Sequence, residues 1–284
     1  MRKTVASVFV FFLACAVTGL QAQSSSFKTA SAQPDLNETW TLPHGTLVKD
    51  AGPRVYRFTV DYNMANSKGE INHRIRLTGD YTRGLPAGDV MWQNVAQAEA
   101  DEATAPYGAP QKRDFMEGFR YHNDMASTMK PDFFKAFPPT AVFERNLVWD
   151  TGMIEVFGQT FFDRLKLNEP MHTGSSDVDM PLVGTFHNRD IVLTWIGRSF
   201  RNGQDCALIR YQAFFNPVEI ANGGMTLQGR SDYWGEIWVS TATKQIEYGT
   251  VNEMVTGEMK LPGQTMTQIV NVFRVGILEP VGAN

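Results

Sequence analysis

Apolar and polar positions alternate along much of this chain, and the longest alternating stretch covers residues 182–278. Within it, runs with the two-residue period of β-strands occupy residues 189–198, 205–215, 225–239, 245–256 and 264–278. Short polar turns separate these runs. Asn202 and Gly203 in one of them suit a two-residue hairpin turn, in which both central residues need a positive φ. The stretch is therefore predicted to form an antiparallel meander.

The N-terminal half begins with the same kind of pattern. Residues 54–62 and 71–78 alternate clearly and residues 90–98 alternate less regularly, whereas residues 99–113 break the pattern with acidic residues, alanines and prolines. A strand of about 15 residues spans roughly 50 Å, which is longer than a compact sandwich usually needs. We therefore expect a mainly β protein with a curved antiparallel sheet or open half-barrel. A β-sandwich is the alternative fold.

Between the two alternating regions the period changes. Asp150 can act as the N-cap of a helix over residues 151–167, where apolar residues recur at spacings of three and four. Residues 130–137 are predicted to form one or two helical turns with Phe133 and Phe137 on one face. We expect both segments to pack against the concave side of the sheet. There the phenylalanines either cover an apolar cavity or belong to ordinary core.

The chain starts with the features of a secretory signal. In residues 1–22 two basic residues precede an apolar run that is shorter than the roughly 20 residues of a membrane span. A competing interpretation is a bacterial lipid anchor at Cys15. Residues 23–50 are predicted to form a flexible linker, and residues 51–284 a single β-rich domain with a helical insertion at about 112–168. We expect a periplasmic or secreted bacterial protein without a transmembrane segment.

Charge and cysteine content limit the partners. The chain has 26 Lys and Arg residues against 30 Asp and Glu, a net charge of −4, and loss of the basic residues in 1–22 would make the remainder more negative. Such a charge argues against nucleic acid and against an anionic membrane surface as partners. Only Cys206 would then remain, so no internal disulfide is expected. We interpret Cys206 as a core residue, with a nucleophile as the alternative. No oligomeric state follows from the sequence.

The sequence contains none of the standard catalytic or cofactor motifs. It has no Gly-x-Ser-x-Gly elbow, no His-Glu-x-x-His, no phosphate-loop lysine motif and no Gly-x-Gly-x-x-Gly. We therefore expect no cofactor. One loop places His172 near Asp177 and Asp179, which are residue types that hold divalent ions, but short acidic loops are more often solvated turns and no metal is expected.

The strand predicted over residues 225–239 brings a distinctive set of side chains to one face. These are Arg230, Asp232, Trp234, Glu236 and Trp238. In a catalytic interpretation, Glu236 is a general acid or base between two tryptophans. In a binding interpretation, the tryptophans form an apolar floor and Arg230 is a polar anchor. In a structural interpretation, the face is exposed to solvent and carries ion pairs across strands.

Residues 233–248 read Tyr-Trp-Gly-Glu-Ile-Trp-Val-Ser-Thr-Ala-Thr-Lys-Gln-Ile-Glu-Tyr, a strand, a polar turn and a returning strand. Together with the signal segment, the meander and the helical insertion, this hairpin resembles the LolA-like and LppX-like periplasmic lipoprotein carriers. The resemblance covers about two thirds of the chain after the signal and rests on pattern. It implies an open half-barrel with an apolar interior, and it assigns no functional residue.

These observations favour an exported bacterial protein that binds a hydrophobic or amphipathic ligand, such as a lipid or an acyl chain, without catalysis. The residues expected to contact the ligand are Arg230, Trp234, Glu236, Trp238, Phe133 and Phe137. One alternative is a secreted hydrolase or isomerase that uses a Glu and a His in a cavity, with Glu236 as the carboxylate. Another is a structural module of the cell envelope.

Overall fold

The computed structural model describes residues 41–42, 48–130, 132–180, 184–222, 225–263 and 267–282. They belong to one compact unit, Trp40–Asn284. The expected signal at residues 1–22 and most of the linker at 23–50 lie outside the described residues. Among the described residues, no helix is long and apolar enough to cross a membrane.

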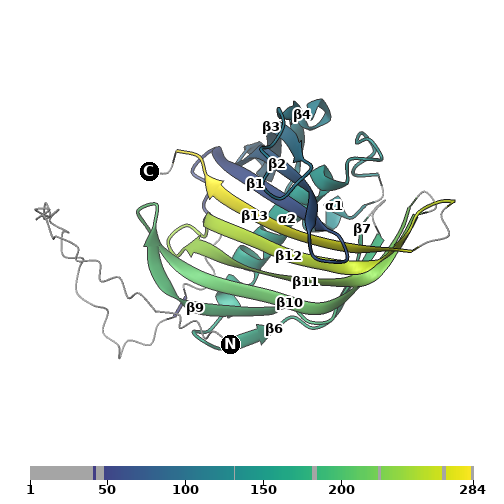
Figure 1. Ribbon diagram of the computed structural model, residues 1–284. Helices are drawn as coiled ribbons and strands as arrows, with labels where there is room; N and C mark the ends of the chain where they lie inside the picture. The colour runs from purple at the N-terminus through teal and green to yellow at the C-terminus, as the bar shows by residue number, and fades with distance from the viewer. Residues whose placement is uncertain are drawn as a thin grey trace, which may run out of the picture. The chain divides into compact units, whose positions relative to one another are not determined.

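In this part of the chain one antiparallel sheet dominates (Figure 1). Its N-terminal strands are β1 (Arg54–Ala65), β2 (Ile71–Arg83), β3 (Asp89–Ala100), β4 (Gln111–Lys112) and β5 (Phe119–His122). The middle strands are β6 (Pro170–His172), β7 (Ser176–Met180), β8 (Gly184–Asn188) and β9 (Val192–Arg201). The C-terminal strands are β10 (Gln204–Asn222), β11 (Met225–Ser240), β12 (Ile246–Lys260) and β13 (Gln268–Pro280).

The strand order is β4-β3-β2-β1-β13-β12-β11-β10-β8-β7, with β5 paired to β3 and with β9 paired to β10 and β6. Strand β1 lies beside β13, so the first and last strands join the two meanders into one sheet. The path does not close on itself, because β4 and β7 end it at opposite edges. The predicted open antiparallel sheet is thus confirmed, and the sandwich alternative is wrong.

The hairpin turn between β9 and β10 agrees with its sequence signal. Asn202 has φ 51° and Gly203 has φ 73°, the left-handed values that a type I′ turn requires at both central positions. Asparagine and glycine adopt these values with little steric cost. The turn pairs Gln204 with Arg201 and so sets the register of the long strand that follows.

The main helix, α2 (Val142–Glu155), continues into a π-helical turn (Val156–Thr160). The predicted start at residue 151 is wrong, because Asp150 lies inside the helix and does not cap it. A buried Asp inside a helix is uncommon unless it is paired, whereas Asp is common at the N-cap, so the sequence alone favours a cap at Asp150. The shorter helical segments are α1 (Met125–Thr128), Pro86–Gly88, Asp114–Met116 and Phe162–Arg164. Within the expected insertion, Phe133 and Phe137 lie in a succession of turns.

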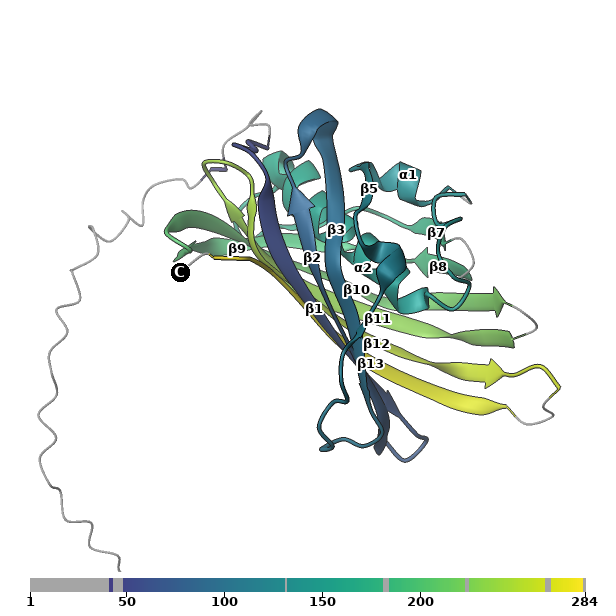
Figure 2. The same ribbon diagram turned by 90° about the horizontal axis from the view of Figure 1, so that it is seen from above.

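Helix α2 lies on the inside of the bend in the sheet (Figure 2). We call the sheet face that contacts α2 the inner face and the opposite one the outer face. The close approach of the helical segment to the sheet requires a glycine at position 158. A Cβ there would lie 2.8 Å from Cδ1 of Ile246 and 2.9 Å from Cγ2 of Ile237. Ile154 from the helix packs over Gly249 of β12 in the same way. The helix and the inner face therefore share one buried core.

The alternation of side chains along β11 explains which of them lie on the inner face. Its odd-numbered residues Tyr233, Ile237 and Val239 are buried against the helix, and Gly235 lies between them. At Gly235 the hydroxyl of Tyr211 reaches toward the neighbouring strand and donates a hydrogen bond to the Thr250 carbonyl at 2.7 Å. A Cβ at Gly235 would lie 2.7 Å from that hydroxyl oxygen, so the glycine leaves room for the bond.

Candidate functional site

A partly open cavity of about 210 Å³ lies between α2 and the inner face of the sheet. The hairpin of β7 and β8 closes one side of it through Ser176, Val178, Phe186 and Asn188. These four residues form two cross-strand pairs, so their side chains point toward the cavity together. Because separate parts of the chain contribute its walls, the cavity depends on the complete fold.

Most of the cavity wall is apolar. Helix α2 and the turn after it contribute Trp149, Met153, Val156 and Phe157, and the loop before β9 contributes Ile191. Trp149 is buried and Phe157 packs against the ring of Tyr211 with centroids 5.1 Å apart. Large apolar side chains with a few polar groups among them are typical of small-molecule sites.

A cluster of three charged residues faces this apolar wall. Arg274 on β13 donates from Nη1 to Asp150 on α2 and from Nε to Glu253 on β12. The side chains of Asp150, Glu253 and Arg274 are only 6%, 8% and 12% exposed. Ser231 donates to the second oxygen of Glu253 at 2.5 Å. The cluster thus ties the helix to two strands while remaining in the wall of the cavity.

Burial shifts the protonation of this cluster. Desolvation, opposed by the neighbouring Arg274, raises the pKa of Asp150 to about 6. Burial disfavours the charge on Arg274, but Asp150 and Glu253 outweigh it and hold the guanidinium pKa above its ordinary value. Burial likewise raises the pKa of Tyr62, whose ring lies near Arg274, to about 12. A carboxyl that titrates near neutral pH beside a cavity marks a candidate functional site.

Neutral hydrogen-bonding groups complete the cavity. Tyr233 donates from its hydroxyl to Oδ1 of Asn188 at 2.9 Å, and Asn188 donates from Nδ2 to Ser176 at 3.4 Å. On the helix, Asn146 donates to the hydroxyl of Tyr62 at 3.2 Å. These contacts link the β7–β8 hairpin to the sheet, and they give the site polar groups that can orient a ligand.

The predicted tryptophan face lies on the other side of the sheet. Trp234, Glu236 and Trp238 are even-numbered residues of β11, and the odd-numbered ones are buried against α2. Strand residues alternate between faces, so Trp234, Glu236 and Trp238 lie on the face opposite the helix. Glu236 pairs with Arg210 of β10 at 3.4 Å, and the side chains of Arg210 and Glu236 are 56% and 44% exposed. Arg230 pairs with Asp232 at 2.8 Å on the same outer face.

The outer face has a depression of its own, of about 560 Å³, over β10, β11 and β12. Trp234 and Glu236 line it together with Phe214 and other residues, whereas Arg230 and Trp238 do not. Trp234 stands between Phe214 and Phe273, with ring centroids 6.2 Å and 6.4 Å away. The depression is larger than the inner cavity, but one face of neighbouring strands supplies all of its walls. We therefore regard the inner cavity, which is walled from several sides, as the better site.

Phe133 and Phe137 lie in an aromatic cluster at the start of the helical region. Phe137 is buried, and its ring lies 5.0 Å from that of Phe134, which in turn lies 5.2 Å from Trp149. Phe133 packs against Phe134 at 4.7 Å. Phe133 and Phe137 thus pack on Phe134, which contacts Trp149, and neither of them lines the cavity.

The candidate metal ligands His172 and Asp177 each pair with a different residue. His172 on β6 contacts Asp190 at 2.5 Å, and Asp177 on β7 contacts His187 at 2.9 Å. The backbone of Asp179 lies in β7, but its side chain is outside the described atoms. No group of three or more His, Cys, Asp or Glu in the described part of the chain could hold a metal ion. The hydrolase or isomerase alternative expects a Glu and a His in the cavity. Among the described side chains that line it there is one Glu, Glu253, but no histidine.

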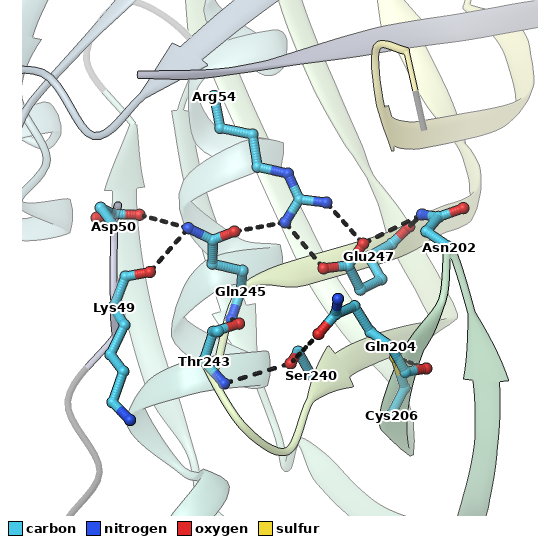
Figure 3. A network of polar contacts seen from close by, with 10 residues as sticks. All are labelled: Lys49, Asp50, Arg54, Asn202, Gln204, Cys206, Ser240, Thr243, Gln245 and Glu247. Atoms are coloured by element: carbon cyan, nitrogen blue, oxygen red, sulfur yellow. Dashed lines mark hydrogen bonds and ion pairs between the residues drawn. The ribbon is translucent and has the colours of Figure 1, made fainter. Parts of the chain in front are cut away.

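A second polar cluster lies where the start of β1 meets two hairpin turns (Figure 3). Arg54 donates to Glu247 at 2.6 Å and to Gln245 at 2.5 Å, and Asn202 donates to Glu247 at 3.1 Å. These groups satisfy one another, so we interpret the cluster as a structural tie. The nearby Cys206 is buried, and burial raises the pKa of its thiol to about 12, which fits an unreactive core residue.

The charged residues of the cavity were missed by the sequence analysis. Asp150 resembled a helix cap, and Glu253 and Arg274 resembled ordinary members of alternating strands. A signal existed in β13, where Arg274 falls on the same face as the buried Leu278, and an Arg at an apolar position needs a partner. Its register neighbour on β12 is Glu253, so the alignment of these two strands pairs the two opposite charges.

Scans against protein-family models and against curated proteins find no match to this chain. Among solved structures, the chain is similar to a structure of lipovitellin that concerns lipid–protein interactions. The TM-score is 0.40 and the sequence identity is 12%. The alignment covers 82% of this chain and 25% of that chain, so this chain spans a minor part of the lipovitellin chain.

Proposed function

We propose that the protein binds a hydrophobic or amphipathic small molecule in the cavity between α2 and the inner face. The observation that carries this proposal is the combination of an apolar wall, including Trp149 and Met153, with the buried pair of Asp150 and Arg274. Apolar walls supply most of the binding free energy, and a few polar groups fix the orientation of the ligand.

The size of the cavity limits what enters it. An apolar cavity of about 150 Å³ holds a benzene ring. The volume of about 210 Å³ therefore suits one ring or a short alkyl segment. Because the cavity is partly open, a longer acyl chain would place only one end inside, and the remainder would lie outside the cavity.

The proposal is tested with an apolar fluorescent probe and with mass spectrometry of an organic-solvent extract of the purified protein. We expect the probe to bind and an amphiphile to co-purify. Met153→Trp should fill the cavity and weaken probe binding by about tenfold or more. The matched control is Trp234→Ala on the outer face, which should leave probe binding unchanged.

Two results would contradict the proposal. One is a wild-type protein that neither binds the probe nor yields a co-purified amphiphile. The other is a loss of probe binding in Trp234→Ala with none in Met153→Trp, which would move the site to the outer depression.

We further propose that the protein is exported and works in the periplasm or outside the cell. The support is the sequence of residues 1–22, with basic residues before an apolar run. The open sheet with a helix on its inner face supports a carrier role of the kind suggested by the resemblance to LolA and LppX. The mass of the exported chain tests this proposal. A mass that corresponds to a chain beginning at Gln23 is expected, whereas a mass that corresponds to a chain beginning at a lipidated Cys15 would show anchoring instead.

A further inference from the structure

We propose that the ligand of the inner cavity carries a positively charged nitrogen, an ammonium group, beside its apolar part. This inference rests on the proposed function and narrows it to cationic amphiphiles. It follows from the charges in the cavity wall, from the aromatic rings around them and from the way in which Arg274 is already engaged.

The charges of the wall do not balance. Among the described residues that line the cavity, the ionisable acids and bases other than Tyr233 are Asp150, Glu253 and Arg274. With both carboxylates ionised, the wall has one more negative than positive charge. The structure describes one ion pair for each carboxylate, and both are made with the guanidinium of Arg274. Asp150 contacts Nη1 and Glu253 contacts Nε. A second cation would complete the pairing, and the ligand is the group that can bring it.

The surroundings favour an ammonium group in particular. Trp149, Phe157, Phe186 and Tyr233 line the same cavity. The faces of aromatic rings attract cations, and tryptophan attracts them most strongly. Carboxylates together with aromatic rings therefore form a site that can replace the water shell of an ammonium group while its alkyl chain contacts Met153 and the other apolar side chains.

A fatty acid fits this wall poorly. Its carboxylate would add a third negative charge next to Asp150 and Glu253, and Arg274 already binds one oxygen of each. Burial of like charges without new partners is costly. The geometry thus distinguishes between two kinds of amphiphile that the apolar wall alone would accept equally.

The protonation state of Asp150 depends on the charges around it. Desolvation raises the pKa of its carboxyl to about 6 although Arg274 opposes the shift, and a ligand cation beside Asp150 would favour the ionised form. The charged and titratable groups around Asp150 are Arg274 on β13, Glu253 on β12, Tyr233 on β11, Tyr211 on β10 and Tyr62 on β1. Burial raises the pKa of all three tyrosines, so they stay neutral near physiological pH. The described β7–β8 side chains in the wall, Ser176, Val178, Phe186 and Asn188, carry no charge.

The test is a competition experiment with the full chain. Octylamine, octanol and octanoate have similar apolar parts and differ in the charge of the head group, and each is titrated against the bound fluorescent probe near neutral pH. We expect octylamine to displace the probe at a concentration about tenfold or more below that of octanol, and octanoate to be the weakest competitor.

A variant and a change of pH then assign the preference to Asp150. In Asp150→Asn the advantage of octylamine over octanol should fall several-fold, whereas Asp61→Asn on the outer face should leave it unchanged. If Asp150→Asn fails to fold, the wild-type protein gives the same information. Below the pKa of Asp150, which is about 6, the advantage should shrink because the wall loses a negative charge.

The outcomes separate the two proposals. Equal affinities for the three competitors, or tighter binding of octanoate, would overturn the ammonium assignment and leave the apolar cavity in place. If none of the three displaces the probe, or the probe does not bind, then the proposed function fails and the assignment fails with it.

Discussion

Arg274 on β13 reaches across the core to Asp150 on α2, a residue 124 positions earlier in the chain. This contact fastens the main helix to the strand that also pairs with β1. It places a charge pair in the wall of an otherwise apolar cavity. The same residues therefore contribute to the stability of the fold and to the character of the proposed binding site.

Arg274→Met is expected to destabilise the protein strongly. The substitution leaves the carboxylates of Asp150 and Glu253 buried without their cation, and removal of one partner of a buried ion pair typically costs about 3–5 kcal/mol. Urea unfolding followed by tryptophan fluorescence measures the free energy of unfolding. The matched control is Arg76→Met, because Arg76 pairs with Asp61 at the surface, where such pairs contribute about 1 kcal/mol or less. Equal losses in the two variants would contradict the structural role of the buried pair.

Asp150→Asn should change how stability depends on pH. Burial raises the pKa of Asp150 from an ordinary value of 3.8 to about 6, so between these values the folded state binds more protons than the unfolded state. Stability from this group is therefore greatest below pH 3.8 and declines as pH rises through 6. Asparagine does not titrate, so the wild-type protein should lose stability relative to the variant across that window. Urea unfolding at several pH values measures the difference, and parallel curves for the two proteins would refute the assignment.

Gly158→Ala should destabilise the protein through a steric conflict. The new methyl group would lie 2.8–2.9 Å from Ile246 and Ile237, closer than carbon atoms pack. Crowding of this kind typically costs about 1–3 kcal/mol, which exceeds the gain of about 1 kcal/mol that alanine brings to a helix. Thermal unfolding should show a lower Tm than for Gly197→Ala, a strand position where a Cβ meets no atom within 4 Å. An unchanged Tm in Gly158→Ala would show that the helical segment does not pack closely against Ile237 and Ile246.

Cys206 should be unreactive in the folded protein. Its side chain is buried, and burial raises the pKa of the thiol to about 12, so almost no thiolate exists near neutral pH. In a Cys15→Ser chain, Ellman's reagent should react slowly in buffer and at once in denaturing urea. Rapid reaction of the folded chain would instead favour the nucleophile interpretation.

Several elements followed directly from the sequence. The two-residue alternation in β1, β2, β11 and β12 identified these strands to within a few residues, because local backbone geometry alone sets that period. The Asn202–Gly203 turn followed for the same reason, since a positive φ is a local property of the residue. The start of α2 did not follow, because the helix is stabilised by its contacts with the sheet. Asp150 is tolerated within it through a partner on a distant strand.

The sequence by itself determined which residues share a face of each strand, and with that the class of fold, because alternation is built into the extended backbone. Only the tertiary structure decided which face is covered. Both faces of β11 carry aromatic rings, and α2 packs on the one with Tyr233, leaving Trp234 outside. The deciding contacts, such as Gly158 against Ile237 and Arg274 with Asp150, join residues far apart in the chain. Packing and ion pairing of this kind depend on distances in space, which no periodicity in the sequence encodes.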